Sequence, residues 1–428
     1  MRTPNLPAHA RRRLLGVLVS VAVVAAPAVA PVQSLGPPPP TPVPVPGGGT
    51  SPSPFPSVLR TPAPGGLETP AIDAEAALLV DLETGQRLFA LDPGEKRPIA
   101  SLTKIMTAYL VLSRTSPADV VTVSENAASG RIVGISTLGL AQGERITVRE
   151  LLYALLLQSA NDAAGALAEH VGGTVERFVG MMNRAAARLG LSRTRLASPN
   201  GLDDAGYSTA GDLARLTRMA LEIPEFAEVV AARSHEVPAP EGEPRVIQNR
   251  NALLWLYPGA TGVKTGFTTA AGFCIVASAE RDGERLLAVV LGERGEAFSD
   301  AAALLNYGFA AFERRTLLEG GTALGPVEVG GRRVDVAAGA DLAGLVRVDA
   351  VVRRRVSVDP AVRYPPARGQ RIGTVVVFVP GGAVGGSVPL VVTDVPPPPP
   401  LDDGGTWWSR ALGALIDAGD GVVDAIFG

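Results

Sequence analysis

The chain has 428 residues, of which 46% are hydrophobic and 19% are charged, and its formal net charge is −3. This length allows two or three domains, and the composition is typical of a globular protein without a nucleic-acid partner. The single cysteine, Cys274, excludes an internal disulfide framework and a multi-cysteine zinc site. It lies in the apolar run 272–276, so we expect a packing role for it in a buried strand.

Residues 1–30 have the pattern of an export signal. Arg11 to Arg13 precede an apolar run at residues 14–26, and Ala28-Val29-Ala30 is a small-residue cleavage site. A membrane span needs about 20 residues, more than this run offers. An uncleaved anchor is the alternative, and both interpretations place the rest of the chain outside the cytoplasm.

A linker rich in Pro, Gly and Ser follows at residues 31–69. Such a segment cannot bury a core. It is either an extended tether or a tail without a role of its own.

Residues 70–315 carry the pattern of one α+β domain. We expect strand pairs over residues 76–91 and 272–291, and short strands at 120–123 and 145–148. Thr209 and Asp212 are possible caps of a helix over 208–221. The other predicted helices start at Ser101 or cover residues 148–157, 162–170, 175–189 and 298–312. Strands at both ends with helices between predict an antiparallel sheet covered by helices.

Residues 316–395 change to short Val-rich runs separated by Gly and Pro, which predicts a small all-β domain. The expected strands are residues 327–329, 333–336, 345–352, 354–358, 374–379 and 388–392.

Residues 396–405 form a second linker, and residues 406–428 return to a helical period. Apolar residues fall on one side of this helix, acidic residues on the other, and Trp407 and Trp408 stand at its start. The pattern indicates an interfacial amphipathic helix and a possible membrane anchor. Because the acidic face opposes anionic lipid, packing on a protein partner or on the β domain is the alternative.

Ser101 stands three residues before Lys104 at the start of an apolar helical pattern. Residues i and i+3 share one face of a helix, so the Lys104 amine should lie beside the Ser101 hydroxyl. An unprotonated amine can take the proton of a serine and make it a nucleophile. Only three of the 39 basic residues are lysines. Arginine cannot be deprotonated, whereas a desolvated lysine can, so these lysines stand out. The alternative is that Lys104 is a solvated charge.

A second motif is Ser159-Ala160-Asn161. A hydroxyl and an amide two residues apart can point the same way only from a turn or loop, where they can relay a proton or bind a substrate amide. Alone, this motif is also an ordinary helix N-cap.

A third motif is Lys264-Thr265-Gly266, just before the strand pair of residues 272–291. A lysine and a threonine on a sheet edge offer a positive charge and a hydroxyl to a carboxylate. Gly266 should let a substrate backbone lie close along that edge. Alone, the triplet could be a plain turn.

The three motifs in this order resemble those of the low-molecular-mass penicillin-binding proteins that are D-alanyl-D-alanine carboxypeptidases, peptidase family S11. The resemblance extends to residues 99–107, 158–164, 198–202, 207–210 and 249–273, and covers about residues 70–315. It implies a fold like that of transpeptidases and β-lactamases. The β domain and the C-terminal helix match that family in architecture only.

The resemblance implies a nucleophile at Ser101, a base at Lys104, and a proton network completed by Ser159 and Asn161. Lys264 and Thr265 would receive the substrate carboxylate. It also implies an oxyanion hole made by the N–H groups of Ser101 and Phe267.

The expected substrate is a peptidoglycan stem peptide ending in D-Ala-D-Ala, with β-lactams as covalent inhibitors and with no metal or cofactor. The family often carries an arginine after the Lys-Thr-Gly strand pair. The only arginine in residues 292–298 is Arg294, which falls a few residues early, so its role stays open.

The sequence also bears on three rival functions. A β-lactamase needs an added base for deacylation, and Asp203 and Asp204 are the nearest acids to the loop at 198–207. A His-dependent hydrolase has only His170 and His235 outside the signal, and neither lies near a nucleophile elbow. The intact motifs argue against a catalytically silent wall-binding protein.

Overall fold

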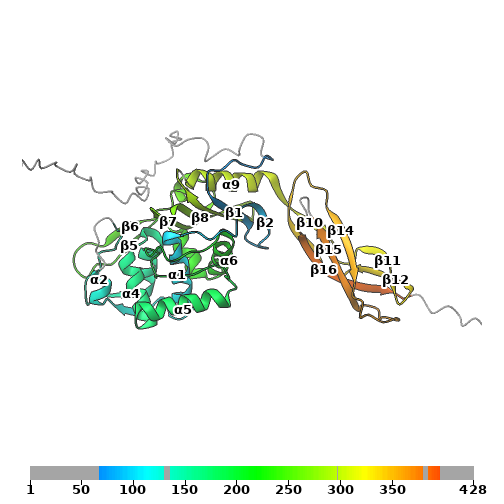
Figure 1. Cartoon of the computed structure of the whole chain (residues 1–428), viewed down its shortest axis with the longest axis horizontal. Helices are drawn as coiled ribbons and strands as arrows, with labels where there is room; N and C mark the ends of the chain where they lie inside the picture. The colour runs from blue at the N-terminus through cyan, green and yellow to red at the C-terminus, as the bar shows by residue number, and fades with distance from the viewer. Residues whose placement is uncertain (1–66, 130–134, 296, 379–383, 396–428) are drawn as a thin grey trace, which may run out of the picture. The chain divides into compact units, whose positions relative to one another are not determined.

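The computed structural model describes residues 67–129, 135–295, 297–378 and 384–395. Its first part is built on a five-stranded antiparallel sheet in the order β2-β1-β9-β8-β7 (Figure 1). The strands are β1 (Ala76–Asp81), β2 (Arg87–Leu91), β7 (Ala260–Thr268), β8 (Gly272–Arg281) and β9 (Glu284–Glu293). Both predicted strand pairs are confirmed, and the third motif lies on β7, an edge strand.

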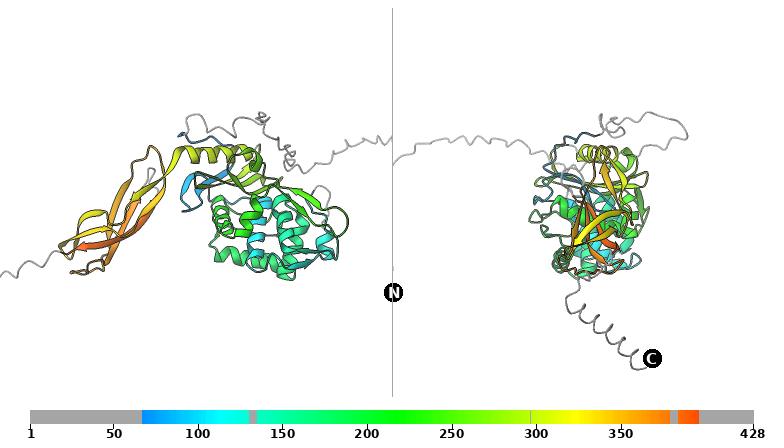
Figure 2. Two further views of the ribbon diagram at one scale, coloured as in Figure 1. Left: turned by 180° about the vertical axis from the view of Figure 1, so that it is seen from behind. Right: turned by 90° about the vertical axis from the view of Figure 1, so that its right-hand side faces the viewer.

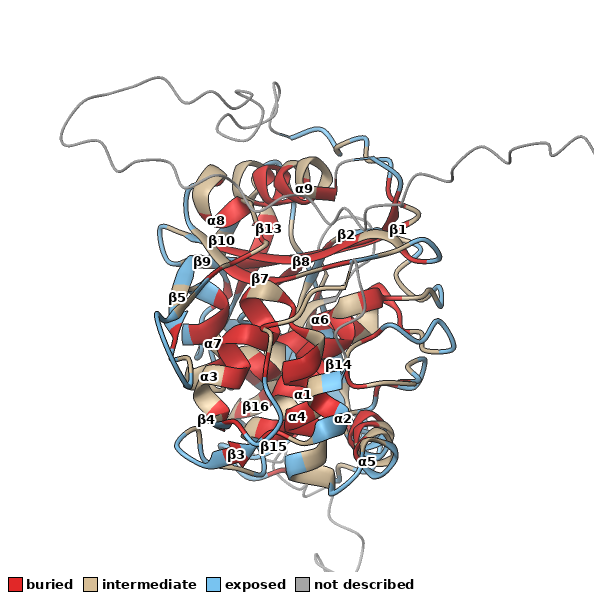
Figure 3. Cartoon of the chain, turned by 90° about the vertical axis from the view of Figure 1, so that its left-hand side faces the viewer, coloured by how far each residue is buried: buried red, intermediate tan, exposed pale blue. Residues whose placement is uncertain are grey.

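Helices cover both faces of this sheet, as Figure 3 shows. Neighbouring strand residues point to opposite faces. Leu78 therefore packs in the core under α1 (Lys104–Leu112), whereas Leu79 packs against Leu304 and Leu305 of α9 (Ala297–Ala311). The sheet is buried on both sides, which confirms the predicted architecture.

The second motif and most of the helices lie on the α1 side. The other helices of this layer are α2 (Glu125–Ser129), α3 (Val148–Tyr153), α4 (Asn161–Gly172), α5 (Val175–Arg188), α6 (Ala210–Leu221) and α7 (Pro224–Ala231). It also contains the strand pairs β3 (Val120–Thr122) with β4 (Arg145–Thr147) and β5 (Ser234–Val237) with β6 (Arg245–Gln248). The short helix α8 (Leu253–Leu256) lies on the opposite side of the sheet, with α9. Thr209 caps α6, since its side chain accepts the N–H of Asp212 at 3.0 Å, as expected. The sequence pattern missed α2, α7, α8, β5 and β6, because elements of four to eight residues show little periodicity.

The second part is all-β, as predicted (Figure 2). One sheet has the order β11-β12-β16-β15-β14, and β10 pairs separately with β13. These strands are β10 (Phe312–Leu318), β11 (Ala323–Val329), β12 (Arg332–Ala338), β13 (Leu342–Arg347), β14 (Arg353–Val358), β15 (Arg371–Phe378) and β16 (Val384–Asp394).

Two details of that region differ from the sequence prediction. The strand expected at residues 345–352 is β13, Leu342–Arg347, because its register is set by pairing with β10. Strand β10 itself was missed: it follows α9 without a break, so no turn residue marks the change from helix to strand.

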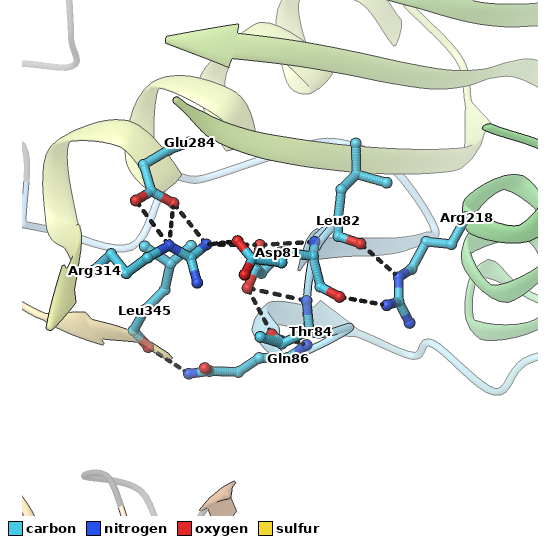
Figure 4. Close-up of polar contacts among 9 residues, drawn as sticks. Asp81, Leu82, Thr84, Gln86, Arg218, Glu284, Arg314 and Leu345 are labelled. Atoms are coloured by element: carbon cyan, nitrogen blue, oxygen red, sulfur yellow. Dashed lines mark hydrogen bonds and ion pairs between the residues drawn. The ribbon is translucent and has the colours of Figure 1, made fainter. Parts of the chain in front are cut away.

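Polar contacts join β10 and β13 to the β1–β2 turn (Figure 4). The Arg314 guanidinium on β10 lies 3.3 Å from Asp81 Oδ1 and 2.8 Å from Glu284 Oε2. The side-chain amide of Gln86 donates to the carbonyl of Leu345 at 2.6 Å. Asp81 is fully buried, so Arg314 balances a carboxylate that has lost its water.

The predicted signal, residues 1–30, the linker at 396–405 and the C-terminal helix at 406–428 lie outside the described residues, as does nearly all of the first linker. Within the described ranges, no helix combines the length and apolar character that crossing a membrane requires.

Candidate active site

Ser101 lies in a 3₁₀ turn, η2 (Ala100–Thr103), that leads directly into α1. Ala100 has a positive φ of 46°, which turns the chain sharply before the serine. Leu102 is fully buried, and its N–H donates to the carbonyl of Ile99 at 3.0 Å. The neighbours thus anchor the turn in the core, while Ser101 itself is half-buried.

Lys104, the first residue of α1, is fully buried. Its Nζ lies 2.9 Å from Ser101 Oγ, and it donates to Asn161 Oδ1 at 2.9 Å and to the carbonyl of Asn200 at 2.7 Å. Burial lowers the pKa of Lys104 well below its ordinary value, and the charges of Lys264 and Arg250 lower it further. The serine and lysine therefore make the contact that their spacing predicted.

The second motif approaches Lys104 from the start of α4. A π-helical turn, η3 (Ala154–Gln158), ends at Ser159, whose left-handed backbone (φ 64°, ψ 33°) breaks the helix. Asn161 then begins α4, and its Nδ2 donates to the carbonyl of Ser136 at 3.0 Å. That bond fixes the amide, so that Oδ1 faces Lys104. The expected turn is present, and Ser159 is buried in it.

The third motif lies on β7. Lys264 is buried, and its Nζ donates to the carbonyl of Thr265 at 2.9 Å. Burial lowers its pKa to about 7, with the charge of Arg250 as a second cause. Phe267 is 37% exposed and packs on Phe273, with ring centroids 4.5 Å apart.

Gly266 has a different neighbour from the one its motif suggested. A Cβ at this position would lie 3.0 Å from the Ser101 nitrogen and 3.1 Å from the Ile99 carbonyl oxygen. The missing side chain therefore lets β7 lie against the η2 turn. This close approach between two segments of the protein is by itself enough to favour glycine at position 266.

Arg250 lies within the stretch that carries the resemblance, but no motif indicates a role for it. It stands two residues after the end of β6, its backbone N–H donates to the carbonyl of Leu157 at 3.0 Å, and its side chain is half-buried. Its charge acts on both Lys104 and Lys264. Sequence spacing could not reveal that Arg250 lowers the pKa of Lys104, because the two residues stand 146 positions apart.

Lys104, Lys264 and Arg250 thus form a cluster of three basic residues. None of the ion pairs recorded among the described residues involves any of them. Positive groups without a protein counter-ion, next to a nucleophile, suit an anionic substrate group. The same positive field disfavours a proton on Lys104.

Other residues singled out in the sequence lie outside this cluster. The Arg294 guanidinium is 88% exposed and pairs with Glu75 at 3.3 Å. Cys274 is buried in β8, where burial raises the pKa of its thiol to about 11, in line with a packing role. His235 lies on β5 and contacts Glu150 at 2.8 Å. None of these three side chains contacts Ser101.

Comparison with known proteins identifies this arrangement. A family model described as D-alanyl-D-alanine carboxypeptidase, peptidase S11, matches residues 64–295, more than half of the chain. The chain belongs to this family. Among curated members, DacC of Escherichia coli K12 is 34% identical over 331 residues, covering 72% of this chain and 81% of that protein. DacB2 of Mycobacterium tuberculosis is 38% identical over 256 residues, covering 58% of this chain and 86% of that protein.

Solved structures of carboxypeptidase relatives share the fold. DacD from Francisella tularensis has a TM-score of 0.65 at 28% identity, covering 78% of this chain and 97% of that chain. Penicillin-binding protein 5 from Haemophilus influenzae has a TM-score of 0.63 at 31% identity, covering 77% and 98%. The predicted family and fold class are therefore confirmed.

Proposed function

We propose that this protein is a serine-type D-alanyl-D-alanine carboxypeptidase that acts through an acyl-enzyme on Ser101. The observation that carries the proposal is the 2.9 Å contact between Ser101 Oγ and the buried Nζ of Lys104. A buried amine surrounded by other cations favours its neutral form, and a neutral amine is the base that a serine nucleophile requires.

The neutral amine has two N–H groups and one lone pair. Asn161 Oδ1 and the Asn200 carbonyl accept the two N–H groups. The lone pair then points to Ser101, whose proton moves to Nζ as Oγ attacks the carbonyl carbon of the penultimate D-alanine. The backbone N–H groups of Ser101 and Phe267 are placed on adjoining segments, η2 and β7, where they serve as an oxyanion hole.

The other two basic residues of the cluster, Lys264 and Arg250, bind the terminal carboxylate of the substrate. Lys264 and Arg250 supply charge, and the Thr265 hydroxyl supplies a hydrogen bond. The substrate backbone lies along the free edge of β7, past Phe267. As the C–N bond breaks, Ser159 gives its proton to the leaving amine and takes the proton that Lys104 holds, so D-alanine leaves as a neutral amine and Lys104 is neutral again. Water then attacks the ester, and Lys104 acts as base a second time.

Residues 1–30 and 406–428 suit a protein that is exported and held at the outer face of the cytoplasmic membrane, where peptidoglycan is the substrate. Deleting residues 407–428 tests the anchor: the mature protein should leave the membrane fraction and still cleave peptide. A deletion variant that still sediments with membranes would assign the anchor to the N-terminal segment or to a partner.

The function is tested with diacetyl-Lys-D-Ala-D-Ala and fluorescent penicillin. The wild-type protein should release D-alanine and become labelled, and Ser101→Ala should do neither. Ser113→Ala, at the exposed far end of the same helix, is the matched control and should do both. Labelling that persists in Ser101→Ala would place the nucleophile elsewhere, and rapid repeated turnover of penicillin would favour a β-lactamase.

A further inference from the structure

The amine of Lys104 has two acceptors besides Ser101, and both help to direct its lone pair. A neutral amine gives its two N–H groups to Asn161 Oδ1 at 2.9 Å and to the Asn200 carbonyl at 2.7 Å. The third contact of Nζ, Ser101 Oγ at 2.9 Å, is then the one left for the lone pair. Misplacing a reacting group by about 1 Å can cost about a hundredfold in rate. The rate of acylation therefore depends on the groups that hold the two acceptors in place.

The Asn200 carbonyl is held through Thr107, a fully buried residue of α1. Thr107 stands three residues after Lys104, so the two side chains share one face of the helix. Its hydroxyl donates to the carbonyl of Pro199 at 2.6 Å, and Pro199 directly precedes Asn200. The helix that carries the lysine thus also fixes the segment that accepts one of its N–H groups.

The loop that contains Asn200 is stiffened by hydrogen bonds of its own. Ser198 Oγ donates to Asn200 Oδ1 at 3.0 Å and accepts the N–H of Gly201 at 2.9 Å. These bonds set the shape of the loop, but they do not set its distance from α1. Among the described residues of α1, Thr107 is the one besides Lys104 whose side chain has a recorded hydrogen bond to this loop.

The other acceptor, Asn161 Oδ1, is oriented by residues 135–140, which we call the strap. The Ser136 carbonyl of the strap accepts two hydrogen bonds from Asn161, one from its backbone N–H at 2.8 Å and one from its Nδ2 at 3.0 Å. Because Nδ2 is held in this way, the oxygen of the amide stays turned toward Lys104. A displacement of the strap would therefore move the acceptor.

Asp162 holds the strap. This side chain is 2% exposed, and its carboxylate accepts three consecutive N–H groups, those of residues 138–140, at 2.9, 2.8 and 3.1 Å. Hydrogen bonds to a charged acceptor are stronger than those between neutral groups. An acidic residue in the first turn of a helix commonly stabilises that helix, and Asp162 does accept the N–H of Ala163 at 2.9 Å. Its other three bonds go to the strap, the segment that orients Asn161.

We infer that Thr107 and Asp162 are positioning residues for the general base. Each holds one of the two groups that direct the amine of Lys104 at Ser101, and within the described residues neither makes a recorded hydrogen bond to Lys104 or Ser101 themselves. The inference rests on the proposed function, in which Lys104 is the base. It gives two buried polar side chains a role in the rate of the reaction in addition to their role in packing.

The loss of an acceptor should change the amine in two ways. Its lone pair is no longer fixed on one atom, so acylation slows. The ammonium form needs three acceptors and the neutral form needs two, so the loss disfavours the ammonium form and lowers the pKa of Lys104 further. Because the protonated enzyme is the inactive form, the acid limb of the pH–rate profile moves to lower pH. Lys264 and Arg250, whose charges also lower this pKa, stay unchanged.

The first test measures the acylation rate constant at saturating penicillin as a function of pH, so that carboxylate binding by Lys264 does not enter. Thr107→Val keeps the shape of the side chain and removes the hydroxyl. Its plateau rate should fall at least about tenfold, and its acid midpoint should lie at lower pH. Thr107→Ser keeps the hydroxyl and should restore both. The matched control is Thr217→Val, because Thr217 is also fully buried and its Oγ1 has no hydrogen-bond partner among the described residues. Its profile should equal that of the wild type.

Asp162→Asn tests the strap. The amide keeps the volume, but its NH₂ group cannot accept the N–H groups that one carboxylate oxygen accepts now. The plateau rate and the acid midpoint should change in the same direction as in Thr107→Val. For diacetyl-Lys-D-Ala-D-Ala, kcat should fall and KM should change little, since the groups that bind the carboxylate are untouched. If Asp162→Asn does not fold, the threonine variants decide.

A double variant separates positioning from stability. In the Lys104→Arg background there is no base to direct, so adding Thr107→Val should leave the residual acylation rate unchanged. An equal loss in both backgrounds, or a lower thermal midpoint with an unchanged pH–rate profile, would show that Thr107 is only structural, and the carboxypeptidase would stand. If the wild-type protein is not acylated, or if Lys104→Arg acylates at the wild-type rate, the proposed function or its base is wrong instead.

Discussion

Gly201 and Ala100 are in direct backbone contact: a Cβ on Gly201 would lie 1.9 Å from the Ala100 carbonyl oxygen. Gly201 also has a φ of +81°, which side chains disfavour. The contact holds the loop that contains Asn200 against the turn that contains Ser101. Since the Asn200 carbonyl accepts a hydrogen bond from Lys104, this glycine positions both partners of the proposed nucleophile–base pair.

We therefore expect Gly201→Ala to displace the η2 turn. The left-handed conformation alone costs roughly 1–2 kcal/mol in a residue with a Cβ, and the clash adds to it. Acylation by penicillin should slow at least about tenfold, the effect of misplacing a reacting group by a fraction of an ångström. Gly283→Ala has nearly the same φ, +82°, with no atom within 4 Å, so it isolates the conformational cost. Equal acylation rates in the two variants would contradict the positioning role.

The substitution Lys104→Arg tests whether Lys104 acts as a general base or only as a structural positive charge. Arginine keeps the charge and nearly the reach, but it cannot be deprotonated near neutral pH. Loss of general-base help typically costs about 10² to 10⁴ in rate, so acylation should fall at least about a hundredfold. The second-order rate constant for penicillin and the thermal midpoint are the measurements. Near wild-type acylation would show that Lys104 is not the base.

The pKa of about 7 at Lys264 predicts a pH dependence of substrate binding. Below pH 7 the amine is charged and attracts the substrate carboxylate, and above pH 7 it loses its proton. KM for the peptide should therefore rise above pH 7, with kcat less affected. Lys264→Arg stays charged throughout, so its KM should be higher than wild type at neutral pH, because the geometry differs, but should not rise with pH. A wild-type KM that is constant from pH 6 to pH 9 would argue against a titrating Lys264.

Arg314→Ala should destabilise the protein without changing its chemistry. Asp81 would lose its cationic partner and, within the described part of the chain, keep the N–H groups of Glu83 and Thr84 and the Thr84 hydroxyl. A buried polar group left without a partner costs about 1–3 kcal/mol, and a charged group costs more. Urea unfolding should show this loss, while kcat/KM stays at the wild-type value. The matched control is Arg354→Ala, on an exposed position of β14. A full loss of activity in folded Arg314→Ala would mean that the junction reaches the active site.

Short-range pattern was enough to predict several parts of this protein. The i, i+3 spacing of Ser101 and Lys104 predicted their contact, because a helical turn brings such side chains together. The capping of α6 by Thr209 and the antiparallel strand pairs were predicted for the same reason: each depends on residues close in the chain. The order of the three motifs indicated the family.

Only the tertiary structure decided what surrounds Lys104. The sequence could not reveal that Arg250 joins the two lysines, that Gly201 touches Ala100, or that Gly266 faces the Ser101 turn. These contacts depend on how loops and strands distant in the chain approach one another, which is set by burial of the whole core. The pKa of a lysine depends on the same long-range burial and charge, so sequence spacing determined which groups could meet, and packing determined what they can do.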